Sequence, residues 1–211
     1  LNRVSKEYQQ YWISFLTSHP KDFNKDLIEV MKKNTNICKY LNLPVQSGSN
    51  SVLRKMNRKY TRSEYLNKIK LLRKEIPDIR LSTDLIVGFS GEKDEDFEDT
   101  LDIVKKGKFS MAYISEYSQR EGTAGFSLDD DVSVEEKKKR KEVLNEVVVE
   151  QAGMFNKKYI GTTQDIVVTG KNIGKTIDLT DVRIKYEKMG VKVKVKIVEA
   201  SECGLVGEVI V

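Results

Sequence analysis

Four short loops of the sequence combine small residues with hydrogen-bonding side chains, and such loops can bind a polar ligand through close backbone contacts. They cover residues 17–20, 46–49, 88–92 and 118–123. Each loop follows a short apolar run that is rich in β-forming residues. Because the loops after the carboxyl ends of parallel strands share one face of a barrel, we expect the four loops to form one composite pocket. Taken singly, each loop is more typical of an ordinary turn or helix N-cap.

Charged and titratable residues near these loops each allow two interpretations. Asp84 lies within an apolar strand sequence, so it either binds a ligand inside the barrel or is a hydrogen-bonded residue of the interior. His19 is the only histidine, and with no cysteine beside it we expect a turn role and no metal ligation. Arg58 is either solvated or a clamp for phosphate or carboxylate. Arg120 either pairs with Glu121 or faces the substrate.

Lysines alternate with apolar residues near the C-terminus, at Lys192, Lys194 and Lys196. In a strand, this alternation places the lysines on one exposed face and the apolar residues on the buried face. Lysines elsewhere in the same segment are Lys171, Lys175 and Lys185. Together they could contact the phosphates of a nucleic acid, or they could form an ordinary solvated face.

The elements that must position these residues follow from hydrophobic periodicity. Strands are predicted at residues 12–16, 40–45, 79–87 and 111–117, separated by amphipathic helices. The apolar helix faces are Phe23, Leu27, Ile28 and Met31, then Tyr65, Ile69 and Leu72, then Phe97, Leu101 and Val104. Capping-box sequences at 61–64 and 133–136 predict helix starts. We therefore expect part of a parallel βα barrel over residues 1–132, a linker helix over 133–158 and a small antiparallel β-barrel over 159–211.

The composition sets limits on these interpretations. Hydrophobic residues make up 39% of the 211-residue chain and charged residues 33%, with a net charge of +5, so we expect a globular protein with a slightly basic surface. Cys38 and Cys203 match no disulfide or metal-ligand spacing, which suits a cytoplasmic protein. No apolar run is long enough to span a bilayer. The start at Leu1 predicts a fragment of a longer protein.

Several motifs, in order and spacing, resemble those of the MiaB-type radical SAM methylthiotransferases. They are Thr17 to Pro20 with Lys21-Asp22-Phe23, Leu43 to Ser49, Met56-Asn57-Arg58 with Tyr60-Thr61, Thr83 to Phe89, and Tyr117-Ser118 with Arg120 to Thr123. The closing segment resembles a TRAM domain, a small RNA-binding β-barrel. The resemblance covers only the second half of the family's length, and the cysteines that hold its [4Fe–4S] clusters are not in this sequence.

This resemblance implies radical S-adenosylmethionine chemistry that adds a methylthio group to C2 of an N6-isopentenyl-type adenosine beside the tRNA anticodon. The cofactor would be bound by Gln46, Ser47, Asp84, Ile86, Val87, Gly88, Tyr117 and Ser118, with Arg58, Arg120, Lys192, Lys194 and Lys196 toward the substrate. The expected partners are a tRNA anticodon stem-loop and the family's N-terminal half, and a half-barrel in isolation is expected to self-associate. The alternatives are a methylthiotransferase for threonylcarbamoyl-adenosine and a non-catalytic RNA-binding remnant.

Overall fold

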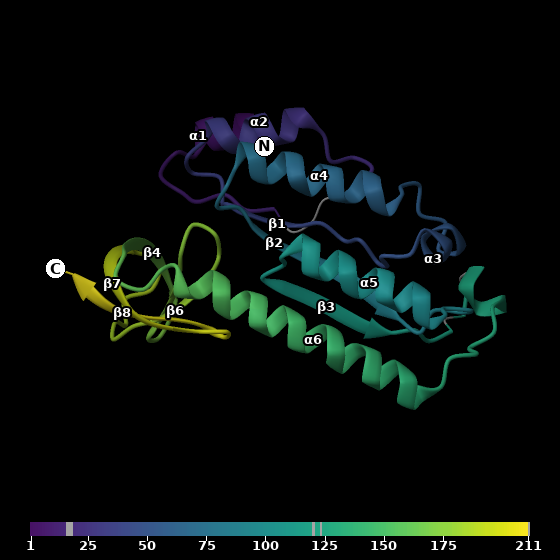
Figure 1. Cartoon of the computed structure of the whole chain (residues 1–211). Coiled ribbons are helices and arrows are strands. Elements are labelled where there is room, and N and C mark those ends of the chain that lie inside the picture. Colours follow the sequence, from purple (N-terminus) through teal and green to yellow (C-terminus); the bar gives the residue numbers. More distant parts are fainter. Residues whose placement is uncertain (16–18, 120, 123, 211) are drawn as a thin grey trace.

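The computed structural model describes residues 1–15, 19–119, 121–122 and 124–210. Figure 1 shows an α/β unit and a small β-barrel, with one long helix running from the first to the second. In the α/β unit, β1 (Tyr40–Asn42), β2 (Arg80–Val87) and β3 (Met111–Glu116) form a parallel sheet in the order β1-β2-β3. Leu41 lies opposite Leu81, and Leu85 opposite Ile114. The βα pattern of the sequence therefore predicted the parallel sheet correctly.

The expected strand at 12–16 is reduced to a single bridge in the described residues. The Ile13 N–H donates to the Asn36 carbonyl (2.8 Å) and the Ile13 carbonyl accepts from the Cys38 N–H (2.8 Å). Ile13 pairs with Ile37 in parallel, just before β1 begins. A ladder needs successive pairs of this kind, and this edge segment has one, so the predicted strand is wrong in extent.

Strand β1 is also shorter than the expected 40–45. Pro44 has no N–H to donate, and the next N–H, that of Val45, bonds to the Thr83 hydroxyl (3.0 Å) instead of a strand carbonyl. Pairing returns as a bridge between Gln46 and Leu85. The proline therefore ends β1 early and frees the backbone that leads into the loop at 46–49.

Helices cover one face of the sheet. They are α2 (Lys25–Lys33), α4 (Arg62–Glu75), α5 (Asp94–Gly107) and α6 (Val134–Lys157), and shorter helices occur at α1 (Asn2–Glu7), α3 (Asn50–Lys55) and the 3₁₀ turn η1 (Ala124–Ser127). The predicted apolar faces pack here: Ile28, Met31, Tyr65, Leu72 and Val104 are buried against Leu41, Leu81 and Leu85 of the sheet. This is the larger of two cores.

The first turn of α4 has the predicted capping box. The Thr61 hydroxyl accepts from the Glu64 N–H (3.3 Å), and the Glu64 carboxylate accepts from the Thr61 N–H (2.7 Å). The second predicted box, at 133–136, is half formed. Ser133 accepts from the Glu136 N–H (3.1 Å), but the Glu136 carboxylate bonds to Arg140 (3.0 Å), because that cation is buried nearby and needs acceptors.

Removing the cap at Thr61 should weaken α4. Thr61→Ala is expected to lower the free energy of unfolding by about 1 kcal/mol, because the Glu64 N–H loses its acceptor. Bonds from Thr61 lower the pKa of Glu64, so the carboxylate's part of the box should be lost as pH falls through that lowered pKa. Urea unfolding measures the change, with Lys70→Ala on the exposed face of α4 as the control. Equal stability of the two variants would contradict the assignment.

The barrel has its own core. Strands β4 (Thr163–Gly170), β5 (Ile173–Lys175), β6 (Asp181–Arg183), β8 (Gly204–Ile210) and β7 (Lys192–Ser201) close in that order around Ile166, Val168, Val182, Ile184, Val195, Ile197 and Leu205. Its neighbours pair antiparallel except β6 and β8, which pair in parallel. The expectation of an antiparallel barrel is therefore wrong at this one pair, where the short strand β6 pairs with β8 and both strands run in the same direction.

Helix α6 was predicted as a linker, and it packs along the α/β unit for much of its length. Leu144 and Val148 are buried in the larger core, while Asn156 near its end bonds to the Ser201 carbonyl of the barrel (2.7 Å). The barrel lies beside the end of the sheet where the strands begin, and the Lys39 N–H donates to the Ile177 carbonyl there (2.9 Å). The loops at the carboxyl ends of the strands therefore lie at the opposite end from the barrel. No helix in the described ranges is long and apolar enough to cross a membrane.

Candidate functional site

A cavity of about 810 Å³ opens at the carboxyl ends of the three strands. Six residues that the sequence singled out line it: Gln46, Arg58, Asp84, Ile86, Tyr117 and Ser118. Other lining residues, which were not among the predicted ligand contacts, include Asn57 and Phe89 of the same motifs, and Tyr113, Ser115 and Leu128. Tyr113 and Ser115 alternate along β3 with side chains that face the helices. Their period of two was visible in the sequence, but which face was the open one was not.

Gln46 holds a backbone conformation that is costly for its residue type. Its φ is 71°, in the left-handed region that glycine occupies without strain. Its N–H donates to the Asp84 carbonyl (2.8 Å), and its carbonyl accepts from the Ile86 N–H (2.9 Å). Such strain in a residue that lines a cavity is typical of functional positions, where the side chain is needed despite the backbone cost.

Asp84 belongs to a ladder of polar groups on the open face of the sheet. Its carboxylate accepts from the Asn42 amide (3.0 Å), the Asn42 carbonyl oxygen accepts from the Ser82 hydroxyl (2.8 Å), and Ser82 lies 2.6 Å from the Tyr40 hydroxyl. Asp84 is half-buried and also lines the cavity. Both interpretations of Asp84 thus have support: it is hydrogen-bonded within the sheet and still has acceptor capacity toward a ligand.

Arg58 has an unsatisfied donor beside the cavity. Its Nε is buried and has no hydrogen-bond partner among the described residues, while its Nη1 lies 3.5 Å from the His19 ring. A buried N–H without an acceptor costs free energy, so a carboxylate or phosphate oxygen of a ligand would be favoured here. His19 itself accepts from the Lys21 N–H (3.1 Å), as a turn residue does.

Three predicted cofactor residues lie elsewhere. Ser47 is fully buried with its hydroxyl against Thr100 (3.3 Å), and Val87 is in the larger core. Gly88 has φ +67°, and a Cβ there would lie 2.3 Å from Cγ of Lys137, so its missing side chain makes room for a lysine. The structure gives these three residues packing contacts and does not place them in the cavity lining.

The predicted substrate residues of the barrel lie on its surface. Lys192, Lys194 and Lys196 are exposed on β7, and the alternating Val195 and Ile197 are buried on the opposite face as predicted. Lys194 pairs with Asp165 (3.0 Å), and the Lys192 ammonium lies 5.0 Å from the Trp12 ring. Further ion pairs join Lys171 to Glu187 and Lys175 to Asp181. Arg120 lies outside the described residues.

The two cysteines cannot hold a metal cluster together. Cys38 is buried, and burial raises its pKa to about 11, whereas Cys203 is exposed on the barrel. In the part of the chain that the structure describes, no three His, Cys, Asp or Glu side chains gather into a metal site. A [4Fe–4S] cluster requires several thiolates around one site, so these residues do not fit it.

Comparison with known proteins agrees with this fold. Residues 1–104 match the Radical SAM superfamily. Coproporphyrinogen III oxidase (HemN) from Escherichia coli, described as a radical SAM enzyme, superposes with a TM-score of 0.55 at 20% identity, over 72% of this chain and 36% of that one. The fold is therefore that of a radical SAM α/β domain, here followed by a small closed barrel.

Curated relatives narrow the family. Proteins named tRNA-2-methylthio-N(6)-dimethylallyladenosine synthase are 40% identical in Finegoldia magna, 42% in Caldicellulosiruptor saccharolyticus and 41% in Clostridium botulinum strain Langeland. These matches cover 94%, 94% and 99% of this chain, and 45%, 44% and 48% of the relatives. Over most of its length, this chain is therefore similar to the MiaB-type methylthiotransferases, which are radical SAM proteins. It spans less than half the length of these relatives.

Proposed function

We propose that this chain is the part of a tRNA methylthiotransferase that completes the S-adenosylmethionine cavity and carries a TRAM-like, RNA-contacting barrel. The substrate would be an N6-isopentenyl-type adenosine in tRNA, modified at C2. The observation that carries the proposal is the cavity at the strands' carboxyl ends, lined by six of the predicted site residues in a chain about 40% identical to curated synthases.

The cavity suits S-adenosylmethionine in size and chemistry. A volume of about 810 Å³ lies within the range of small-molecule sites, and its walls combine apolar Ile86 and Phe89 with polar Gln46 and Asp84. The unsatisfied Arg58 Nε would bind a carboxylate oxygen, and Asp84 would accept a hydrogen bond. Held in this cavity, S-adenosylmethionine would supply the radical chemistry of the reaction. The iron–sulfur cluster's ligands would come from the rest of the whole protein.

The barrel would contact RNA through the lysines that remain available. Ion pairs to Asp165, Asp181 and Glu187 offset three of the six lysines named from the sequence. Lys185 and Lys196 are exposed, and Lys192 is exposed with its ammonium over the Trp12 ring. Phosphate contacts by such lysines would add affinity that weakens with salt, without choosing a sequence.

A glycine at position 46 separates side-chain function from backbone strain. In the whole protein, Gln46→Gly is expected to weaken S-adenosylmethionine binding by about tenfold, or ~1.4 kcal/mol, because the cavity loses a polar contact. Folding stability should not fall, because glycine relieves the strain of φ 71°. Equilibrium dialysis measures binding, and thermal unfolding checks the fold.

Activity tests the rest of the proposal. The intact protein is expressed in cells that have no other methylthiotransferase of this kind. Mass spectrometry of their transfer RNA should then detect the methylthio group. Its absence would disprove the proposed reaction. If the tRNA is modified but Gln46→Gly binds the cofactor as tightly as the unaltered protein, the proposed reaction is supported and Gln46 is not a cofactor residue.

A further inference from the structure

Two cations near the start of α6 are buried. Lys137 and Arg140 are each 3% exposed, although the surrounding sequence, 137–141, is entirely basic. Residues three apart on a helix share a face, and this face contacts the loops after β2 and β3. Buried cations are costly unless they are paired and hydrogen-bonded, so their partners indicate what this part of α6 holds.

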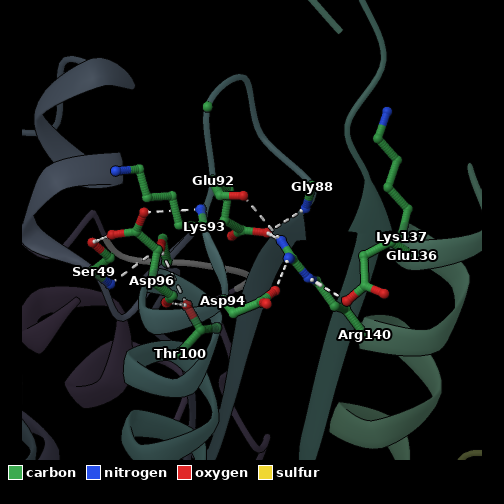
Figure 2. A network of polar contacts seen from close by, with 12 residues as sticks. Ser49, Gly88, Glu92, Lys93, Asp94, Asp96, Thr100, Glu136, Lys137 and Arg140 are labelled. Atoms are coloured by element: carbon green, nitrogen blue, oxygen red, sulfur yellow. Dashed lines mark hydrogen bonds and ion pairs between the residues drawn. The ribbon is translucent and has the colours of Figure 1, made fainter. Parts of the chain in front are cut away.

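Arg140 holds the loop after β2 from within. Its guanidinium donates to the Glu92 carboxylate (2.8 Å) and to the Glu92 carbonyl (3.3 Å), and the same carboxylate oxygen accepts from the Gly88 N–H (2.6 Å). Figure 2 shows Arg140 reaching Asp94 as well (2.7 Å). The loop from 88 to 92 is therefore closed on itself through one carboxylate, which the guanidinium fixes to α6.

The pKa directions of this pair agree with a buried ion pair that is not fully satisfied. Burial raises the pKa of Glu92, and the bonds from Gly88 and Arg140 offset this only in part. Burial opposes the charge of Arg140, but its bonds to Glu92 and Glu136 outweigh this and raise its pKa. One Glu92 oxygen is left without a partner among the described residues. The pair is thus retained at a cost, which suggests a role other than stability.

Lys137 holds the loop after β3. Its ammonium donates to the Tyr117 carbonyl (3.0 Å) and pairs with Asp130. Its aliphatic stem fills the space where Gly88 lacks a side chain. One side chain therefore contacts both loops, and glycine at 88 is required both by φ +67° and by this close approach.

The two loops that are held in this way form one wall of the cavity. Phe89 follows Gly88 and Tyr117 ends the run from β3, and their ring centroids lie 4.7 Å apart. Both rings line the cavity. Within the described residues, the lining includes neither Lys137 nor Arg140. These cations therefore contact the two loops on the side away from the cavity.

We propose that Lys137 and Arg140 are positioning residues, which set the Phe89–Tyr117 wall of the cofactor cavity by fixing the loops after β2 and β3 to α6. This rests on the proposed function for the identity of the ligand. The holding of the loops itself does not depend on which ligand is bound.

The test uses Lys137→Met in the whole protein. Methionine lacks the ammonium that donates to the Tyr117 carbonyl. It keeps much of the apolar stem under Gly88, so the fold should survive. Amide hydrogen exchange should become about tenfold faster at residues 88–92 and 117–119, while the amides of α4 stay unchanged. The dissociation constant for S-adenosylmethionine should rise about tenfold. The thermal midpoint should change little, because Asp130, which loses its cation, is partly exposed to water. Lys138→Met, at an exposed neighbouring position, is the control and should change none of these.

Arg140→Gln is a second variant, expected to loosen residues 88–92 more than 117–119. It leaves Glu92 buried without its cation and should also lower the thermal midpoint, so Lys137→Met decides the proposal. Unchanged loop exchange in Lys137→Met would overturn it, and so would faster exchange with undiminished cofactor affinity. If the unaltered protein does not bind S-adenosylmethionine, the proposed function fails, and the exchange rates alone then support or overturn the holding of the loops.

Discussion

Replacing Arg80 with methionine is expected to lower the free energy of unfolding by about 3–5 kcal/mol, because it leaves a buried carboxylate without its cation. Arg80 is the first residue of β2, and its guanidinium donates to Asn156 of α6 (2.8 Å) and to Thr180 of the barrel (2.6 Å). Asp178 lies 4.0 Å away with a side chain only 3% exposed. One side chain thus joins the sheet, the long helix and the barrel.

Asp178 would keep its other partners in this variant. The Tyr159 hydroxyl donates to it (2.6 Å), as does the Thr180 hydroxyl (2.7 Å). Burial raises the pKa of Tyr159 and nearby Asp178 raises it further, so the phenol stays protonated as a donor. These bonds cannot replace the positive charge, and the guanidinium's packing over the Phe155 ring, 5.4 Å from its centroid, is also lost.

Urea unfolding of Arg80→Met measures the loss, with Arg183→Met as the control. Arg183 is exposed on β6, so its replacement should change the free energy of unfolding by less than about 0.5 kcal/mol. A loss of under about 1 kcal/mol for Arg80→Met would show that the barrel does not depend on this network.

Gly48→Ala is expected to cost about 3 kcal/mol or more, because the new methyl group has no room. An added Cβ would lie 2.2 Å from the Asp99 carbonyl oxygen and 2.5 Å from Cα of Thr100, both backbone atoms of α5. The Gly48 N–H also donates to the Thr100 hydroxyl (2.9 Å). Either α5 or the loop that carries Gln46 must move, so the cavity should lose cofactor affinity along with stability.

Gly153→Ala is the matched control for this substitution. It lies within α6, and its new Cβ would lie 3.9 Å from its nearest neighbour, Cβ of Glu202. Alanine favours a helix over glycine by about 0.5–1 kcal/mol, so stability should rise. Thermal unfolding of both variants decides the matter, and similar behaviour of the two would contradict the close packing of Gly48 on α5.

Local patterns in the sequence were enough to predict much of the fold. The run 79–87 predicted β2 within one residue, and the period of the apolar residues after Thr61 predicted the buried face of α4. The alternation of lysine with valine and isoleucine predicted which side of β7 faces the barrel core. These features are set by residues close in sequence, and their period shows directly which side of an element is buried.

Only the tertiary structure decided which loop residues reach the cavity and which support it. Gln46 and Ser47 are neighbours of similar polarity, yet one lines the cavity and the other is buried against Thr100. Arg140 is one of five consecutive basic residues, and its partner Glu92 is 48 positions away. Nothing in this charge run distinguishes one cation from the next, but the structure buries Lys137 and Arg140 at the cavity loops.

The physical reason is the range of the interactions. By itself the sequence determined the order of βα units, the helix start at Thr61, the strand-end loops and the small second core, because these depend on periodicity and local hydrogen bonds. Other features depend on partners that only packing brings together. They are the docking of the barrel through Arg80, the reduction of the predicted strand 12–16 to one bridge, and the two buried cations of α6. A side chain's partners across the fold cannot be read from its neighbours along the chain, and those distant partners determine the shape of this cavity.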